Sequence, residues 1–194
     1  KIPSISADSN YKDSMLKTAE AVKENLLQAG CDAAEICETP GHPVVYAEKI
    51  IDKNLPTVLV YGHYDVQPPD PLNLWNSDPF EAVERKGRLY GRGAADNKGP
   101  QIVHMAALAR ALKKNPDLPL RITYLIEGEE EIGSPSFREF LEQGKDRLQG
   151  DFLLVSDTGS PGPEQLAITT GLRGLVALEV KVRSEEHTSE LQSP

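Results

Sequence analysis

Three short apolar runs constrain the fold of this chain more than any other feature of its sequence. They cover residues 57–61, 120–126 and 151–155. Continuous apolar runs of this length, bounded by turn residues, are typical of strands that are buried on both faces of a sheet. A helical pattern at residues 11–29 precedes them and another at residues 97–113 lies between the first two, with apolar residues at three- and four-residue spacing. This alternation predicts an α/β layer fold with a largely parallel sheet.

Weaker patterns predict the remaining elements. Further strands are expected at residues 33–38, 44–50, 88–90, 165–170 and 175–182. A third helix is expected to begin with Ser134 as its N-cap and Pro135 as its first helical residue. Phe137, Phe140 and Leu141 would form the inner face of this helix.

Charge and length limit the class of protein. The chain has 194 residues, which suits one ordinary domain, with 30 acidic against 21 basic side chains and a net charge of −9. Such a chain is repelled by a phosphate backbone, so nucleic acid is not expected as a partner. No run reaches about 18 apolar residues, so no membrane span is expected.

The two cysteines, Cys31 and Cys37, are too far apart on an extended segment to form a disulfide. A reducing, cytoplasmic location is therefore expected. A removed signal peptide stays open as an alternative, because the chain begins with Lys1 rather than Met.

Polar residues of metal-ligand type follow the three apolar runs. In open α/β sheets, ligands bind outside the carboxyl ends of the strands. The residues concerned are His63 and Asp65 after the first run, Glu129, Glu130 and Glu131 after the second, Asp157 after the third, and Asp96 just before the second helix. One histidine and several carboxylates, without a thiolate cluster, suit Zn²⁺ or Mn²⁺ in a hydrolytic site with one or two ions.

Each of these features also has a structural explanation. A lone His-x-Asp is commonly structural, a run of glutamates is commonly a solvated face, and an Asp before a helix is commonly its cap. Their joint placement favours a site. His63 and Asp65 point to the same face of an extended segment, so one can bind a metal while the other supports it. Glu130 and Glu131 can divide two tasks, metal binding and proton transfer.

Five motifs give the chain a resemblance to one family of peptidases. They are VLVYGHYDVQP, LYGRGAADNKGP, IEGEEEIGS, VSDT and TTGLRG, in this order. On these motifs the chain closely resembles the co-catalytic di-zinc peptidases of the aminoacylase, glutamate carboxypeptidase and carnosine dipeptidase family. The dipeptidase branch is nearest, through residues 63–68 and 171–174. The resemblance implies a three-layer α/β/α catalytic domain with a mostly parallel mixed sheet, and hydrolysis of dipeptides or short peptides.

The resemblance also implies a role for each site residue. His63 and Asp157 would bind one Zn²⁺, Asp96 would bridge two ions, Glu131 would bind the second ion, Glu130 would be the general base and acid, and Asp65 would support the site. Mn²⁺ or Co²⁺ are alternatives to zinc. A cis peptide bond is expected between Asp96 and Asn97.

One ligand of that family has no counterpart here. The second ion would use a histidine from much later in the chain, and His42, His104 and His187 do not stand at a matching position. We therefore expect this chain to be an N-terminal fragment that is inactive by itself.

The resemblance also sets the expected domain boundaries. Residues 1–170 would belong to the catalytic domain, and residues 171–182 to the first strand of a lid domain through which the full-length protein forms a homodimer. Residues 183–194 read RSEEHTSELQSP, which resembles a translated sequencing adapter, so this tail is expected to be non-native.

Two other functions stay open. One is an amidohydrolase of the same family that acts on N-acyl amino acids, and the other is a non-catalytic metal-binding scaffold. A serine hydrolase is unsupported, because no Gly-x-Ser-x-Gly motif occurs.

Overall fold

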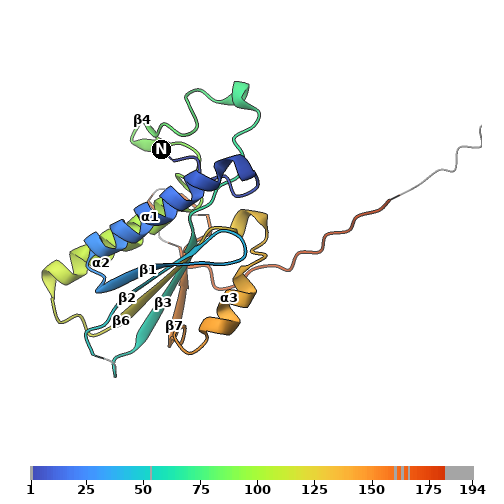
Figure 1. Cartoon of the computed structure of the whole chain (residues 1–194). Coiled ribbons are helices and arrows are strands. Elements are labelled where there is room, and N and C mark those ends of the chain that lie inside the picture. The colour runs from blue at the N-terminus through green and yellow to red at the C-terminus, as the bar shows by residue number, and fades with distance from the viewer. Residues whose placement is uncertain (1, 53, 160, 163, 166, 182–194) are drawn as a thin grey trace, which may run out of the picture. The chain divides into compact units, whose positions relative to one another are not determined.

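The computed structural model describes residues 2–52, 54–159, 161–162, 164–165 and 167–181. It contains two compact units, Lys1–Asp157 and Thr158–Pro194. The first unit is built on a five-stranded sheet with the strand order β1-β2-β6-β3-β7 (Figure 1). Every residue expected at the metal site belongs to this unit.

The sheet is mixed, with a parallel half and an antiparallel half. Its strands are β1 (Ala33–Cys37), β2 (Val44–Lys49), β3 (Thr57–His63), β6 (Arg121–Glu127) and β7 (Phe152–Val155). Strand β3 runs parallel to both β6 and β7, whereas β2 is antiparallel to β1 and β6. A separate hairpin joins β4 (Val83–Arg85) to β5 (Arg88–Tyr90). The carboxyl ends of β3, β6 and β7 therefore meet at one edge of the sheet.

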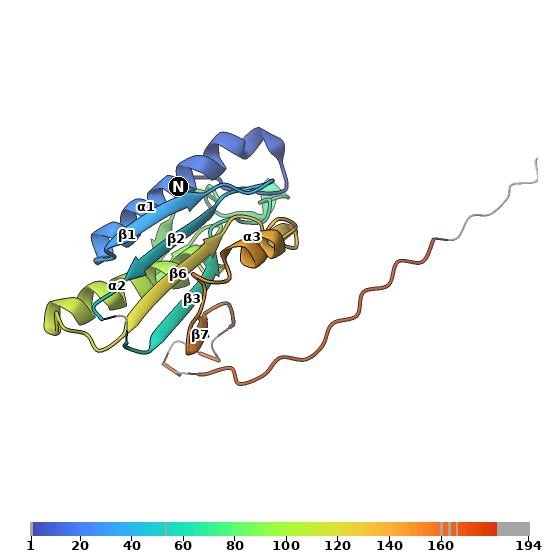
Figure 2. The ribbon, with the colours of Figure 1, turned by 60° about the horizontal axis from the view of Figure 1, so that its bottom comes forward.

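Helices cover both faces of the sheet, which confirms the three-layer α/β/α class. On one face lie α1 (Lys12–Ala29) and α2 (Lys98–Lys114), and on the other lies α3 (Phe137–Gly144) (Figures 1 and 2). Short 3₁₀ turns are η1 (Ser9–Tyr11), η2 (Leu72–Leu74) and η3 (Glu130–Ile132). Among the described residues, no helix is long and apolar enough to cross a bilayer.

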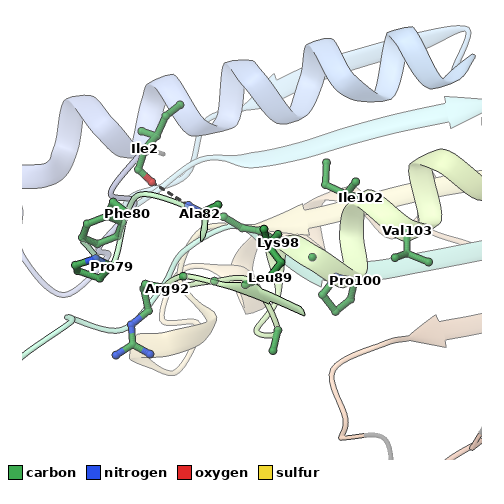
Figure 3. A pocket seen from close by; sticks show the side chains of 15 residues that line it. Ile2, Pro79, Phe80, Ala82, Leu89, Arg92, Lys98, Pro100, Ile102 and Val103 are labelled. Carbon is green, nitrogen blue, oxygen red and sulfur yellow. Dashed lines mark hydrogen bonds between the residues drawn. The ribbon is translucent and has the colours of Figure 1, made fainter. Parts of the chain in front are cut away.

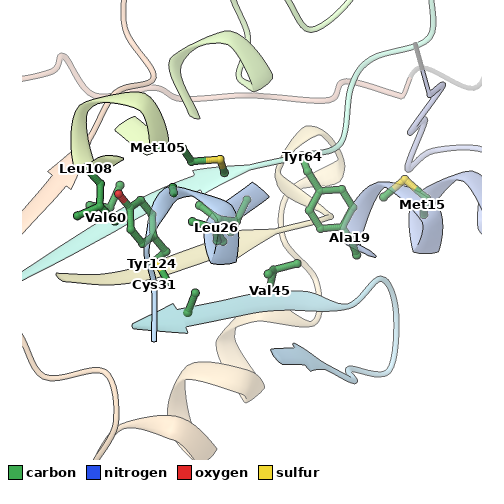
Figure 4. Close-up of a cluster of buried hydrophobic side chains, with 13 residues drawn as sticks. Met15, Ala19, Leu26, Cys31, Val45, Val60, Tyr64, Met105, Leu108 and Tyr124 are labelled. Carbon is green, nitrogen blue, oxygen red and sulfur yellow. The ribbon is translucent and has the colours of Figure 1, made fainter. Parts of the chain in front are cut away.

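The main core lies between the sheet and the first two helices. Helix α1 contributes Met15, Ala19 and Leu26, the strands contribute Val45, Val60 and Tyr124, and α2 contributes Met105 and Leu108 (Figure 4). These side chains are buried, and each large one stabilises the fold by roughly 1.5–3 kcal/mol. The core holds α2 against β3. It therefore places Asp96 and Asn97, which come directly before α2, beside the carboxyl end of β3.

Strand β7 differs from the prediction, because it is exposed rather than buried. Its neighbouring residues Phe152 and Leu153 are 62% and 66% exposed although their side chains point to opposite faces. The strand pairs only with β3, at the edge of the sheet. An apolar run indicates the capacity for burial, but burial itself depends on partners that the run does not specify.

Helix α3 begins later than predicted. Its N-cap is Ser136 rather than Ser134, and no side chain caps it. The Ser134 hydroxyl donates instead to the carboxylate of Glu127 at 2.9 Å. A contact seven residues back along the chain therefore outweighs the local capping pattern. Phe137 faces the sheet as expected, with its ring 5.7 Å from the ring of Tyr61.

The last two predicted strands are wrong for the residues that can be described. Gln165 forms an isolated bridge with Gly162 instead of a strand, and residues 167–181 have no regular secondary structure. A strand needs a hydrogen-bonded neighbour, and the sequence pattern does not supply one. Val182 and the tail at residues 183–194 lie outside the described residues, so the domain boundaries stay predictions.

The two cysteines are free thiols, as expected. Burial raises the pKa of Cys31 to about 12 and that of Cys37 to about 11. Cys31 packs in the core, whereas Cys37 is half-buried. Because the thiolate is the reactive form, both thiols are expected to be poor nucleophiles at neutral pH.

We expect a thiol reagent to label Cys37 at least about tenfold faster than Cys31, because the thiolate is scarcer and more shielded at Cys31. The labelling rate of Cys37 should rise about tenfold per pH unit from pH 7 to 10. A Cys37→Ser variant isolates Cys31, which should react only after denaturant is added. Equal rates for the two thiols in the folded protein would contradict this expectation.

Candidate metal centre

The predicted site residues come together where the parallel strands end. His63 is the last residue of β3 and pairs in register with Glu127, the last residue of β6. Asp157 follows β7, and Asp96 lies just before α2. Two groups of three have ligand atoms within 4.8 Å of one another: His63 with Asp96 and Glu131, and His63 with Glu130 and Asp157.

His63 is the centre of this cluster. Its side chain is fully buried, and its Nε2 lies 3.0 Å from Asp96 Oδ1, 3.4 Å from Asp157 Oδ2 and 3.9 Å from Glu130 Oε2. Burial lowers the pKa of His63, but the hydrogen bond and charge of Asp65, with the other carboxylates, outweigh it and raise the pKa to about 9. The imidazole is therefore held among carboxylates that favour a cation at this point.

Asp65 supports the cluster from the other side of the ring. His63 Nδ1 lies 3.2 Å both from the backbone oxygen of Asp65 and from its Oδ1. The Oδ2 atom accepts hydrogen bonds from Ser6 Oγ at 2.7 Å and from the backbone N–H of Glu131 at 3.0 Å. The buried Asp65 carboxylate thus joins the histidine, the glutamate loop and the N-terminal segment, and it leaves Nε2 of His63 facing the other carboxylates.

The loop before α2 presents Asp96. The Asp96–Asn97 peptide bond is cis, as the resemblance implied. Gly99 packs against this loop so closely that a Cβ there would overlap the backbone oxygen of Ala94. Lys98 donates to the backbone oxygen of Ile2 at 3.0 Å rather than to a carboxylate of the cluster. The Asp96 carboxylate, 63% exposed, is left on the open side of His63.

The donor set fits a divalent cation. Among the described residues, Asp96, Glu130 and Asp157 form an ion pair with His63 and with no Lys or Arg. Carboxylates held this close repel one another unless a cation lies between them. One imidazole nitrogen with several carboxylate oxygens is a set that suits Zn²⁺ or Mn²⁺.

The run of glutamates is not a solvated face. Glu129 is buried and accepts hydrogen bonds from the backbone N–H groups of His42 and Ser136 at 3.0 and 2.9 Å. Glu127 is also buried and accepts from the hydroxyl of Tyr61 at 2.6 Å. Glu130 is partly exposed, and burial with the neighbouring carboxylates raises its pKa. The inner glutamates anchor the loop, whereas Glu130 and Glu131 remain for the site.

Three supporting residues were missed by sequence reasoning. Gln67 Nε2 donates to the backbone oxygen of Glu131 at 3.0 Å and to its Oε2 at 2.9 Å. The other two are Ser6, beside Asp65, and Asn97, which donates to Asp157. Gln67 stands two residues after Asp65, so in an extended segment both side chains point to the same face. This spacing could have predicted that Gln67 lies near the site.

A separate pocket lies near this site but is not part of it. It has a volume of about 610 Å³ and lies between the loop at residues 79–95 and the start of α2, where Pro79, Phe80, Ile102 and Val103 line it (Figure 3). None of the six predicted site residues lines it. The candidate centre is therefore defined by its converging ligand atoms rather than by this apolar pocket.

Comparison with known proteins identifies the family. Residues 59–193 match Peptidase family M20/M25/M40. The chain belongs to this family. It is 41% identical over 154 residues to the Beta-Ala-His dipeptidase of Homo sapiens, covering 77% of the chain and 30% of that protein. It is 32% identical over 193 residues to the Cys-Gly metallodipeptidase dug1 of Schizosaccharomyces pombe, covering 93% of the chain and 40% of that protein.

Solved structures of the family share the fold. The M20 family metallo-carboxypeptidase Sso-CP2 from Sulfolobus solfataricus matches with a TM-score of 0.74 and 39% identity, over 81% of the chain and 35% of that structure. Human carnosine dipeptidase 1 matches with a TM-score of 0.74 and 34% identity, over 81% of the chain and 36% of that structure. The chain thus spans 30–40% of the length of these relatives. Membership of this metallopeptidase family implies divalent metal ions.

The hydroxyl of Ser6 offers a first test of the centre. We expect Ser6→Ala to weaken Zn²⁺ binding by roughly tenfold, because loss of a hydrogen bond behind a metal ligand typically has an effect of this size. Titration calorimetry with zinc measures it. Ser4→Ala is the matched control, since the hydroxyl of Ser4 is also buried but donates to the backbone oxygen of Tyr64. Equal losses in both variants would show that Ser6 has no specific role.

Proposed function

We propose that this chain carries the His63–carboxylate part of the active centre of a metal-dependent dipeptidase. The observation that carries the proposal is the convergence of one buried imidazole and four carboxylates at the carboxyl ends of the parallel strands. Relatives named as dipeptidases support peptide-bond hydrolysis as the reaction, and dipeptides or short peptides as the substrates.

In this proposal each carboxylate has its own task. His63 and Asp157 would hold one ion, Asp96 would serve both ions and Glu131 would hold the second, as the family resemblance implies; the ligand atoms of these residues lie within reach of a cation. We propose zinc for both ions, with Mn²⁺ or Co²⁺ as alternatives. When bound, such a cation supplies Lewis-acid chemistry, since it polarises a carbonyl group and makes water more acidic.

Glu130 is proposed as the general base and acid. No hydrogen bond from another described residue occupies its carboxylate, and its Oε2 lies 3.9 Å from His63 Nε2, beside the ligand atoms. It takes a proton from the attacking water while the C–O bond forms at the peptide carbonyl. It then gives the proton to the leaving nitrogen as the C–N bond breaks. Asp65 meanwhile holds the His63 ring in place from its Nδ1 side.

The proposal is tested by hydrolysis assays with dipeptides and N-acyl amino acids, with and without a chelator. They are run on the 194-residue chain and on a version extended to the length of its relatives. Metal-dependent cleavage of dipeptides by the extended version is the expected result, and the short chain should be inactive. Preference for N-acyl amino acids would indicate an amidohydrolase rather than a dipeptidase. Zinc binding without any hydrolysis would indicate a scaffold.

The homodimer and the cytoplasmic location remain predictions. Light scattering of the extended version measures its mass in solution. A dimer that reverts to a monomer on removal of the segment after residue 170 would support the lid as its interface.

A further inference from the structure

The position of Asp157 is not explained by packing. It follows β7, whose four residues are exposed and which pairs with β3 alone. Yet the Asp157 side chain is 24% exposed, less than the residues of β7 before it, and its Oδ2 lies 3.4 Å from His63 Nε2. Some contact other than core packing must hold this carboxylate beside the imidazole.

That contact is made by Asn97, whose side chain is completely buried. Its Nδ2 donates to the backbone oxygen of Ser156 at 2.9 Å and to Asp157 Oδ1 at 3.1 Å. Both hydrogens of the amide are therefore used on the two residues that follow β7. Asn97 is also the N-cap of α2, but its side chain makes no capping hydrogen bond. The side chain thus serves Asp157 rather than the helix.

Two further residues set the orientation of the Asn97 amide. Gln101, one turn along α2 and also buried, donates through Nε2 to Asn97 Oδ1. With its oxygen accepting there, the Asn97 NH₂ group is directed to Ser156 and Asp157. Gly62 of β3 provides the room, because a Cβ at this position would overlap the Gln101 amide. Gly62 thus makes room for Gln101, Gln101 orients Asn97, and Asn97 holds Asp157.

We propose that Asn97 is a positioning residue for the metal centre. It holds Oδ1 of Asp157 so that Oδ2 faces His63 Nε2 before any cation arrives. This inference rests on the proposed function, since Asp157 is a ligand only if the centre binds metal. Asn97 lies next to Asp96 in the chain, so one short segment contributes a carboxylate to the cluster and also orients a second carboxylate there.

Zinc affinity tests the proposal. Asn97→Ala should weaken zinc binding about 10- to 100-fold, the usual effect of losing a partner of a metal ligand. Asn97→Asp, which has the same shape but replaces the donor by a negative charge, should bind no better than Asn97→Ala. Asn115→Ala is the matched control at the other end of α2, where the exposed side chain is far along the helix from Asn97, and it should stay within twofold. A folded Asn97→Ala variant with wild-type affinity overturns the proposal.

A metal-free measurement separates this inference from the proposed function. In a double-mutant cycle, Asn97→Ala and Asp157→Ala should couple by roughly tenfold in the equilibrium constant for unfolding in urea. Coupling below twofold overturns the positioning role. If the wild-type protein binds no zinc, the proposed function fails, and the cycle still decides whether Asn97 holds Asp157. If Asn97→Ala does not fold, Gln101→Met, which removes the donor to Asn97, takes its place under the same criteria.

Discussion

A Glu130→Gln variant of the extended protein is expected to lose about 10²- to 10⁴-fold in the turnover of dipeptides while it keeps its bound metal. Glutamine has the same shape as glutamate but cannot accept a proton from water at neutral pH. The Glu130 carboxylate accepts no hydrogen bond from the described residues, so the substitution leaves no donor without a partner. Turnover is measured with saturating dipeptide, and metal content by mass spectrometry.

Two further substitutions serve as comparisons for the Glu130→Gln variant. Glu131→Gln removes a proposed ligand next in the chain, so it should reduce bound metal as well as turnover. Glu142→Gln, in an exposed pair with Arg138, should change neither. A Glu130→Gln variant that retains a third or more of wild-type turnover would refute its role as the base. Loss of metal in this variant would instead reassign Glu130 as a ligand, as the group of His63, Glu130 and Asp157 allows.

Local patterns predicted the layers of this fold well. Periodic apolar residues placed α1 and α2 within one residue of their observed bounds, and the apolar runs located β3, β6 and β7. These features depend on the chain within one element. The register of the sheet then brings the carboxyl ends of the parallel strands to one edge, which is why residues so far apart in sequence could be predicted as one cluster.

Features that depend on a distant partner could not be predicted in this way. The exposure of β7 depends on what covers it, and the hydroxyl of Ser134 is used by Glu127 rather than by helix α3. The hydrogen bonds that support the site residues also depend on distant partners. The bond from Ser6 to Asp65 joins residues 59 apart, and that from His42 to Glu129 joins residues 87 apart. A single sequence has no periodicity that reports such pairs.

His63→Asn is expected to lower zinc affinity by more than about 100-fold, a larger loss than that of any supporting residue. His63 is a direct ligand of one ion in the proposed centre and the member shared by both groups of potential ligands, so its loss removes a metal ligand rather than an orienting contact. Competition with a chromophoric chelator measures the affinity. His104→Asn is the matched control, because His104 is a partly buried histidine on α2 that belongs to neither group.

The same variant should also destabilise the metal-free protein, by about 3 kcal/mol. At neutral pH the imidazole of His63 is the cation that faces the fully buried Asp65, since its pKa is about 9. Asparagine leaves that carboxylate buried without a counter-charge. The charged histidine stabilises this carboxylate, so the difference between wild type and variant should be full below pH about 6.5, the pKa of an unfolded histidine, decrease as the pH rises towards 9, and be lost above 9, where the wild-type imidazole is neutral. Urea unfolding in the presence of a chelator measures the free energy at each pH, and a difference that is constant from pH 6 to 10 would assign the loss to packing rather than to charge.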